Sequence, residues 1–286
     1  MQGESPKYDI DSLEIGVGMN QVDNLVPSSY FYEAVNQAKS YSALESILQE
    51  YYAKQDLSNR NVRDTMECDM VAVRIAEQIN TPTFAFSHTT LNAIHKRLFG
   101  GVFRQINEKY VGKFRDYNIA KREPILGGES VRYGAYDEML EYLQYDFEAE
   151  AKRNYALIPK EKNKYIARFI GNIWAIHPFA EGNTRTTAVF AIQWLQYHLG
   201  FRLNNAIFKA HSKYFRNALV LDSYSDPMNG IGADSSYLES FIEKWLVDKD
   251  LELKSMPKNI YTRNVMEISP QENHISDKIT EILDKR

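Results

Sequence analysis

Cysteine is almost absent from this chain of 286 residues, and Cys68 is the only one. A single thiol can form no intramolecular disulfide and can build no zinc site of the cysteine type, so a reducing compartment is favoured. No stretch reaches the ~18 apolar residues of a membrane span, and the first residues lack the basic start and apolar run of a secretory signal. We therefore expect a cytoplasmic protein without a membrane segment.

The chain also lacks an excess of either charge. Its 34 Lys and Arg stand against 38 Asp and Glu, which gives a formal net charge of -4, and neither sign forms a long block. Proteins that bind nucleic acid or anionic membranes usually carry a concentrated basic surface. The composition therefore predicts partners other than nucleic acid or membranes.

Apolar residues make up 44% of the sequence and recur mostly with the period of a helix. This pattern predicts a mostly α fold. Residues 1–28 are expected to be irregular, and the polar tail is expected to hold a short helix near 275–284. The main helices are expected at residues 30–54, 61–79, 87–100, 136–152, 160–176, 184–199, 209–221 and 235–248.

One segment has the composition of β structure. In GKFRDYNIAKREPILGGESVRYGAYDEM, which covers residues 112–139, two short runs flank Gly127 and Gly128. A glycine pair between short extended runs is typical of a hairpin turn. We predict a small β-hairpin here.

The stretch IHPFAEGNTRTT, residues 176–187, lies between two apolar helical segments and carries more polar chemistry than a turn requires. The second helix should begin near Thr184, and the free N–H groups of a helix N-terminus attract anions. Gly182 lets the backbone approach a phosphate, while Asn183 and Arg185 offer an amide and a guanidinium. These residues predict a phosphate-binding loop.

Two further side chains extend the chemistry of this loop. Glu181 would be repelled by bound phosphate unless a divalent cation lay between them, and Mg²⁺ is commonly held by one or two carboxylates plus phosphate oxygens. His177 carries an imidazole, whose ordinary pKa near ~6.5 suits it to accept the proton of an attacking hydroxyl. A base, a metal ligand and a phosphate cradle can together transfer part of a nucleotide to an alcohol.

IHPFAEGNTR resembles the signature of the Fic family, His-Pro-Phe-x-Asp/Glu-Gly-Asn-Gly/Thr/Lys-Arg. LNAIHKRLFGGVF, GKFRDYNIAKREPI and KAHSKYFRNALV are similar to other family segments and occur in the same order. The resemblance implies a Fic-type helical core over residues 61–247 with a β-hairpin flap. An N-terminal extension with at least one helix would cover residues 1–60, and a C-terminal extension would cover residues 248–286.

The resemblance also implies an activity. Fic proteins usually transfer AMP from ATP to a Ser, Thr or Tyr hydroxyl of a target protein and release pyrophosphate, as bacterial-type regulators or toxins do. In this chain His177 would be the general base, Glu181 the Mg²⁺ ligand and Arg185 the contact for the outer phosphates. Gly182, Asn183 and Thr184 would surround the inner phosphates.

The flap would bind the target protein. Its tip contains Ile125, Leu126, Gly127 and Gly128, and it would add a strand to an extended target segment through main-chain hydrogen bonds. A small inhibitory partner protein and a homo-oligomer are further partners that the sequence leaves open.

Two features leave the level and control of activity open. Many family members carry a second arginine three residues after the first, and this chain has Ala188 there. Ser46 to Glu50 begins like the inhibitory pattern Ser/Thr-x-x-x-Glu-Gly/Asn, but Tyr51 follows. Glu50 is therefore a candidate inhibitory residue, and a solvated helix face is the plainer interpretation.

Two alternative functions stay open. A Fic-like phosphotransferase would release ADP, but such relatives carry Lys-Arg where this chain has Thr184-Arg185. A nucleotide-binding regulatory module without catalysis is the other alternative, and Ala188 is the argument for it.

Overall fold

The computed structural model describes residues 9–103 and 108–262, which are mostly helical. The prediction of a mostly α fold is confirmed, while the short helix expected near 275–284 lies outside the described residues. No helix in the described part of the chain combines the length and apolarity needed to cross a membrane. The α-helices are α1 (Ile10–Asn20), α2 (Ser29–Gln37), α3 (Tyr41–Tyr52), α4 (Arg60–Ile79), α5 (His88–Phe99), α7 (Met139–Ala151), α8 (Lys162–Ile176), α9 (Asn183–Gln193), α10 (Ile207–Ser223) and α11 (Ser236–Leu246).

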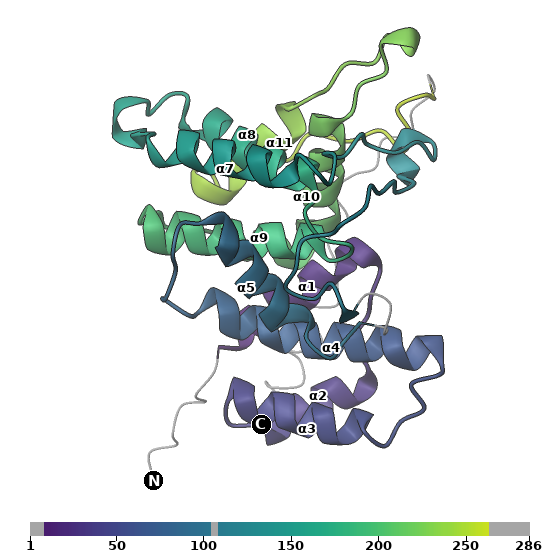
Figure 1. Ribbon diagram of the computed structural model, residues 1–286. Coiled ribbons are helices and arrows are strands. Elements are labelled where there is room, and N and C mark those ends of the chain that lie inside the picture. Colours follow the sequence, from purple (N-terminus) through teal and green to yellow (C-terminus); the bar gives the residue numbers. More distant parts are fainter. Residues whose placement is uncertain (1–8, 104–107, 263–286) are drawn as a thin grey trace.

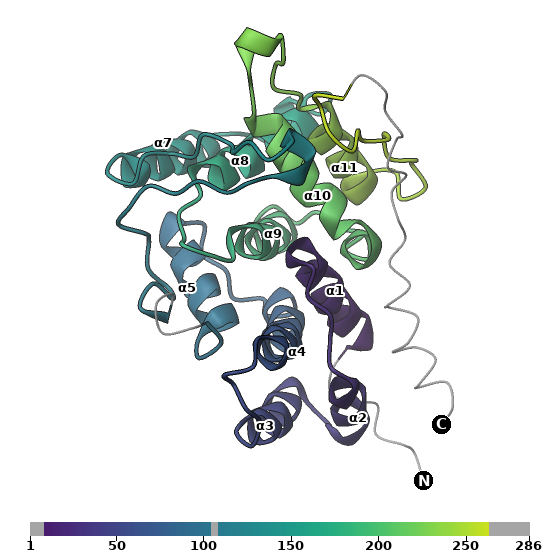
Figure 2. The same cartoon turned by 90° about the vertical axis from the view of Figure 1, so that its right-hand side faces the viewer.

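The helices are arranged in tiers around α9. Figure 1 shows α7, α8 and α11 on one side, α5 and α9 in the middle, and α4 followed by α2 and α3 on the other side. Figure 2 shows α1 between α10 and α4 and beside α9. Every residue of α9 is buried. A helix enclosed in this way holds its N-terminus, and the loop before it, in a fixed place.

Residues 10–20 form a buried helix, although the sequence predicted irregular structure over the first 28 residues. Two glycines let α1 approach its neighbours closely. A Cβ on Gly16 would lie 2.3 Å from the carbonyl oxygen of Ala72 in α4, and a Cβ on Gly18 would lie 2.3 Å from the carbonyl oxygen of Phe208 in α10. Larger residues cannot occupy these positions without moving a backbone, so α1 fits tightly between α4 and α10.

The single helix predicted over residues 30–54 is divided into α2 and α3, because Ser40 begins a new helix as an N-cap. Asp69 of α4 joins this pair of helices to the core. Its carboxylate accepts hydrogen bonds from the Ser28 N–H at 3.0 Å and from the Tyr52 hydroxyl at 2.6 Å. Burial raises the pKa of Asp69 to about 6.

Aromatic side chains pack α9 against α7 and α8. The ring centroids of Phe147 and Phe190 are 5.5 Å apart, and those of Phe169 and Trp194 are 4.8 Å apart, in edge-to-face geometries that favour aromatic packing. The helix predicted over 184–199 continues beyond α9 as a short π-helix, Trp194–His198. This cluster fixes α8 and α9 relative to each other, and the loop between them is the one singled out in the sequence.

The segment between α5 and α7 contains the flap, which we define as residues 118–134. Its turn is the 3-10 helix Pro124–Leu126, and across it the Glu123 N–H donates to the Glu129 carbonyl at 2.9 Å. The prediction of a β-hairpin was wrong in one respect, because the flap turns back on itself without forming a regular ladder. The fully buried Glu123 accepts a hydrogen bond from Arg216 of α10 at 2.9 Å, which draws the flap inward and replaces strand pairing as its anchor.

Candidate active site

The loop of residues 177–182 begins with His177, which ends α8 in the left-handed conformation at φ 53°. Arg115 fixes this turn from the segment that leads into the flap. Its guanidinium donates to the carbonyls of His177 at 2.8 Å, Ile176 at 3.1 Å and Tyr117 at 2.6 Å, and also to that of Gly134. One buried side chain thus joins the end of α8 to both ends of the flap.

His177 is buried and is prepared to accept a proton. Its Nδ1 lies 3.1 Å from the Trp174 carbonyl, which can only accept, so Nδ1 carries the hydrogen and Nε2 carries the free lone pair. Nε2 is buried and has no hydrogen-bond partner within the described residues. Burial, followed by the charge of Lys121, lowers the pKa of His177 well below its ordinary value. The imidazole is therefore neutral at pH 7, as a general base must be.

Tyr133 of the flap covers this base. Its ring lies over the imidazole of His177 with the centroids 4.0 Å apart, and it also contacts the Trp174 ring edge-on. The side chain of Tyr133 is itself 8% exposed. For a substrate hydroxyl to reach Nε2, the flap must either open or leave a gap beside Tyr133.

Two polar side chains of the loop are used to hold its own shape. Asn183 accepts from the Phe179 N–H at 2.8 Å and donates to the Phe179 carbonyl at 2.7 Å. The Thr184 hydroxyl accepts from the Trp174 indole N–H at 2.9 Å. The sequence analysis assigned the Asn183 amide to a phosphate, and the structure instead commits it to the backbone. Any role of Asn183 and Thr184 toward an anion therefore falls to their backbone N–H groups.

The N-terminus of α9 offers such groups. The Thr186 N–H makes the first intrahelical bond, to the Gly182 carbonyl at 3.0 Å, so the three N–H groups before it have no acceptor within the helix. Gly182 has φ 74°, and a Cβ there would lie 2.5 Å from the Phe99 ring. Only glycine fits this position. The N–H groups of residues 183–185 and the positive end of the α9 dipole both favour an anion at this place, so the residues present fit a phosphate.

Glu181 projects beside this N-terminus and fits a metal ion. Its backbone carbonyl is held at 3.0 Å by His95 Nε2, whose ring stacks on Phe179. Its side chain is 45% exposed, and within residues 9–103 and 108–262 the cation that pairs with it is Lys121 of the flap, at 2.8 Å. A half-exposed carboxylate on a braced backbone can exchange a lysine for Mg²⁺ without leaving a buried charge unpaired.

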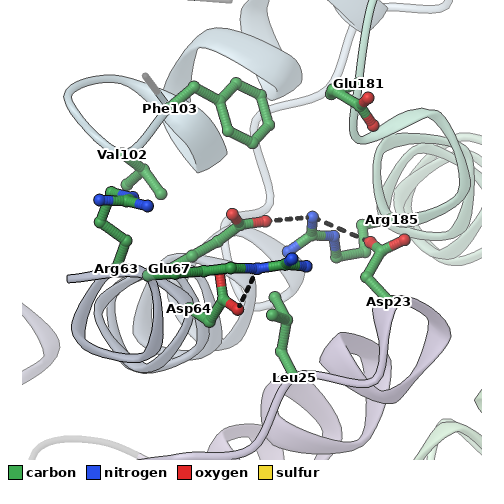
Figure 3. Close-up of a pocket in the computed structure, with 10 residues that line it drawn as sticks. Asp23, Leu25, Arg63, Asp64, Glu67, Val102, Phe103, Glu181 and Arg185 are labelled. Carbon is green, nitrogen blue, oxygen red and sulfur yellow. Dashed lines mark hydrogen bonds and ion pairs between the residues drawn. The ribbon is translucent and has the colours of Figure 1, made fainter. Parts of the chain in front are cut away.

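Arg185 is almost fully enclosed, with 2% of its side chain exposed. Figure 3 shows its guanidinium between the carboxylates of Glu67 and Asp23, at 2.6 Å and 2.9 Å. It also donates to the Asn20 side-chain oxygen at 2.8 Å. Although burial opposes the charge, Asp23 and Glu67 raise the pKa of Arg185 above its ordinary value. Its fork is therefore occupied by protein carboxylates rather than open to a phosphate.

A cavity of about 430 Å³ opens between Glu181 and Arg185 on one side and α4 on the other. Figure 3 shows Phe103 on one side of this cavity and Asp64 and Glu67 of α4 on the other, while the Arg63 side chain reaches from α4 to beside Val102. This space is large enough for the outer phosphates of a nucleotide that enters from the N-terminus of α9.

The predicted residues divide into three groups. His177, Glu181 and the segment 182–185 lie around one loop, and their roles stay predictions. In the flap, Ile125 and Leu126 are buried, so its exposed tip is formed by the glycines that follow them. Glu50 is exposed on α3 and belongs to none of the groups that surround Arg185 in the described structure.

Several residues of the site were missed by the sequence analysis. Arg115 could have been found from the sequence, because it belongs to GKFRDYNIAKREPI, a segment that was recognised as family-like but given no role. Glu67, Asp23 and Lys121 had none, because they come from segments distant in sequence and have no local pattern of their own. The loop of the site is thus made of consecutive residues, whereas the charged partners of Glu181 and Arg185 come from distant parts of the sequence.

A buried neutral histidine, a helix N-terminus with free N–H groups and a neighbouring carboxylate are the groups that a transferase of phosphate-containing groups would need. Residues 85–195 match the Fic/DOC family, a range that contains α5, the flap, α8 and α9. This part of the chain is similar to the Fic/DOC family, and the match supports a Fic-type enzyme in general. The comparisons with curated proteins and with solved structures found no match to the chain. The outer boundaries of the predicted core, residues 61 and 247, stay predictions.

Proposed function

We propose that this protein is an adenylyltransferase that moves AMP from ATP to a Ser, Thr or Tyr hydroxyl of a target protein in the cytoplasm. The observation that carries the proposal is the bare Nε2 of neutral His177 in the same loop as the unpaired N–H groups that begin α9. A base and an anion-binding site at this spacing suit attack of an alcohol on a phosphorus atom.

In the proposed reaction, the target hydroxyl oxygen attacks the α-phosphorus while its proton moves to Nε2 of His177. A new bond forms between that oxygen and the α-phosphorus. The bond from the α-phosphorus to the oxygen bridging the β-phosphate breaks, and pyrophosphate leaves. The N–H groups of residues 183–185 would stabilise the charge that develops on the α-phosphate oxygens.

Arg115 and His95 act through the backbone in this scheme. Arg115 fixes the carbonyl of His177 and so aims the imidazole, while His95 fixes the carbonyl of Glu181 and so aims the carboxylate. Glu181 would hold Mg²⁺, which when bound neutralises phosphate charge. The flap is expected to bind an extended target segment, with its exposed glycine tip as the contact.

The deciding experiment incubates the purified protein with Mg²⁺, a cell lysate, and either α-labelled or γ-labelled ATP. Label that reaches protein from α-labelled ATP alone supports AMP transfer. Label from γ-labelled ATP with release of ADP identifies a phosphotransferase instead.

His177→Ala should lower the transfer by roughly 10² to 10⁴ while ATP binding and the melting temperature stay close to those of the unchanged protein, because only the proton acceptor is lost. Full transfer by a folded His177→Ala variant would remove the proposed mechanism.

The non-catalytic module is kept as a second candidate because Arg185 is held by two carboxylates. If the fork never opens to phosphate, the domain could bind a nucleotide weakly and turn over none. Saturable ATP binding without any labelled product, in lysate from several sources, would favour this alternative.

A further inference from the structure

Lys121 of the flap is a cation beside the proposed metal ligand Glu181, and the proposed reaction gives it no role so far. Its Nζ donates to the Glu181 carboxylate at 2.8 Å, and 27% of the lysine side chain is exposed. After burial itself, its charge is the largest influence that keeps His177 neutral. The ammonium therefore contacts the proposed metal ligand and is close enough to the proposed base to influence its charge.

The other cations around the loop are committed to protein partners. Arg185 is clamped by Glu67 and Asp23, Arg115 donates to backbone carbonyls, and Arg216 donates to the buried Glu123. The position where many relatives have a second arginine is Ala188, which is 2% exposed within the core. Two more guanidinium groups, those of Arg60 and Arg63, line the cavity from α4. Arg60 is paired with Asp64 and Arg63 donates to backbone carbonyls, so both already have protein partners.

Lys121 differs because its partner is the carboxylate that Mg²⁺ would take. If Glu181 held the ion, the attraction between Lys121 and that carboxylate would weaken, and the three N–H donors of the lysine would be free to turn to phosphate oxygens. An ammonium is a compact charge that suits phosphate without demanding a fixed fork geometry.

We propose that Lys121 is a phosphate-binding residue that holds Glu181 before the nucleotide arrives and a phosphate oxygen of the nucleotide afterwards. This role rests on the proposed function of the loop and extends it to the flap. It supplies the positive charge that Ala188 does not.

A purely structural role predicts different behaviour. A partly exposed lysine and carboxylate pair contributes little to the stability of the fold. The flap is also anchored independently, by Glu123 with Arg216 and by the Ile260 N–H, which donates to the Ile125 carbonyl at 3.0 Å. Loss of Lys121 should therefore leave the fold intact.

The test measures binding of adenosine, AMP, ADP and ATP to the full chain by calorimetry, with and without Mg²⁺, for Lys121→Ala and Lys121→Arg. The matched control is Arg122→Ala, which removes the same charge from the exposed neighbour on the flap. Lys121→Ala should weaken Mg²⁺-ATP binding at least tenfold, and Lys121→Arg less than threefold. Adenosine affinity, the melting temperature and the Arg122→Ala values should stay near those of the unchanged protein.

Equal ATP affinity for Lys121→Ala and Arg122→Ala would overturn the proposal. So would a loss that is the same for adenosine as for ATP, because the lysine would then act on the shape of the flap rather than on phosphate. Failure of the wider function is recognised separately. It would appear as absence of labelled product with the unchanged protein, whereas failure of this inference leaves that product intact.

Discussion

At the scale of single residues, the state of His177 determines how the reaction responds to pH. A base works only when unprotonated, and burial together with Lys121 lowers the pKa of His177 well below 6.5. We expect kcat/KM for AMP transfer to stay level as the pH falls from 8 through 6.5, and to decline only at a lower pH. The measurement is a rate profile between pH 5 and 8, with circular dichroism at each pH to show that the protein stays folded. A half-maximal rate at pH 6.5 or above would contradict the neutral, shielded imidazole.

The carboxylates on Arg185 lead to a second expectation. If phosphate and Glu67 compete for the same fork, Glu67→Gln should tighten ATP binding by at least about threefold, because the amide holds the guanidinium less strongly. Glu50→Gln is the matched control, since Glu50 is exposed on α3, and it should change binding by less than threefold. Calorimetric affinities and melting curves of both variants provide the check. Equal values would mean that Arg185 ties α9 to α4 and never binds phosphate.

Placing the second motif arginine back at position 188 would not complement the Glu67→Gln experiment. Ala188 is 2% exposed and lies in the hydrophobic core, so an arginine there would bury a charge or displace a helix. Judged from the family motif alone, Ala188→Arg would be expected to improve ATP binding. The packing around α9 predicts loss of stability instead.

At the scale of the helices, Asp69 links α2 and α3 to α4 and makes this link dependent on pH. Its pKa is about 6 in the folded protein because of burial, and 3.8 is the ordinary value. The folded state binds the proton more tightly, so this group's contribution to stability is complete below pH 3.8 and is lost as the pH rises through about 6. Asp69→Asn should remove that dependence. The difference in melting temperature between the unchanged protein and the variant should be larger at pH 4.5 than at pH 7.5, by at least about 2 °C, and a constant difference would argue against a raised pKa.

The helices that the sequence predicted well are those with local signals. The Ser87 cap and the Gly100 stop bound α5 closely, and α4, α7, α8 and α11 fall within a few residues of their predicted ranges. α1 was missed because it is buried on all sides and contains two glycines, which removes both the amphipathic period and the propensity signal. The flap was predicted as strands because its composition fits them, but Glu123 and Arg216 hold it by side chains.

The site, like the helices, has one part with a local sequence signal and another part without one. The loop around His177 could be predicted because its donors and acceptors follow one another in the chain. The clamp on Arg185 and the lysine on Glu181 could not, since each joins segments brought together only by the fold.

At the scale of the whole molecule, stability depends on how closely α1 approaches its neighbours. Gly16→Ala adds a methyl group 2.3 Å from the Ala72 carbonyl oxygen, and we expect it to cost roughly 1 to 3 kcal/mol despite the better helix propensity of alanine. Gly232→Ala is the matched control, because a Cβ there meets nothing within 4 Å, and its effect should stay within about 0.5 kcal/mol. Chemical denaturation of both variants provides the measurement. A Gly16→Ala protein as stable as the unchanged chain would mean that α1 is not packed as described.

The place of α1 also affects the order in which the protein can form. Its residues leave the ribosome early, yet one of the two surfaces that enclose it belongs to α10, Ile207–Ser223, which is synthesised much later. Until then a glycine-containing helix with little propensity of its own has only part of its binding surface. Contacts so distant in sequence slow folding, and a chain that must wait for them exposes apolar surface while it waits. We infer that α1 is fully enclosed only after α10 has been made, and that the loop of residues 177–182 becomes fully ordered only when α1 is seated beside α9.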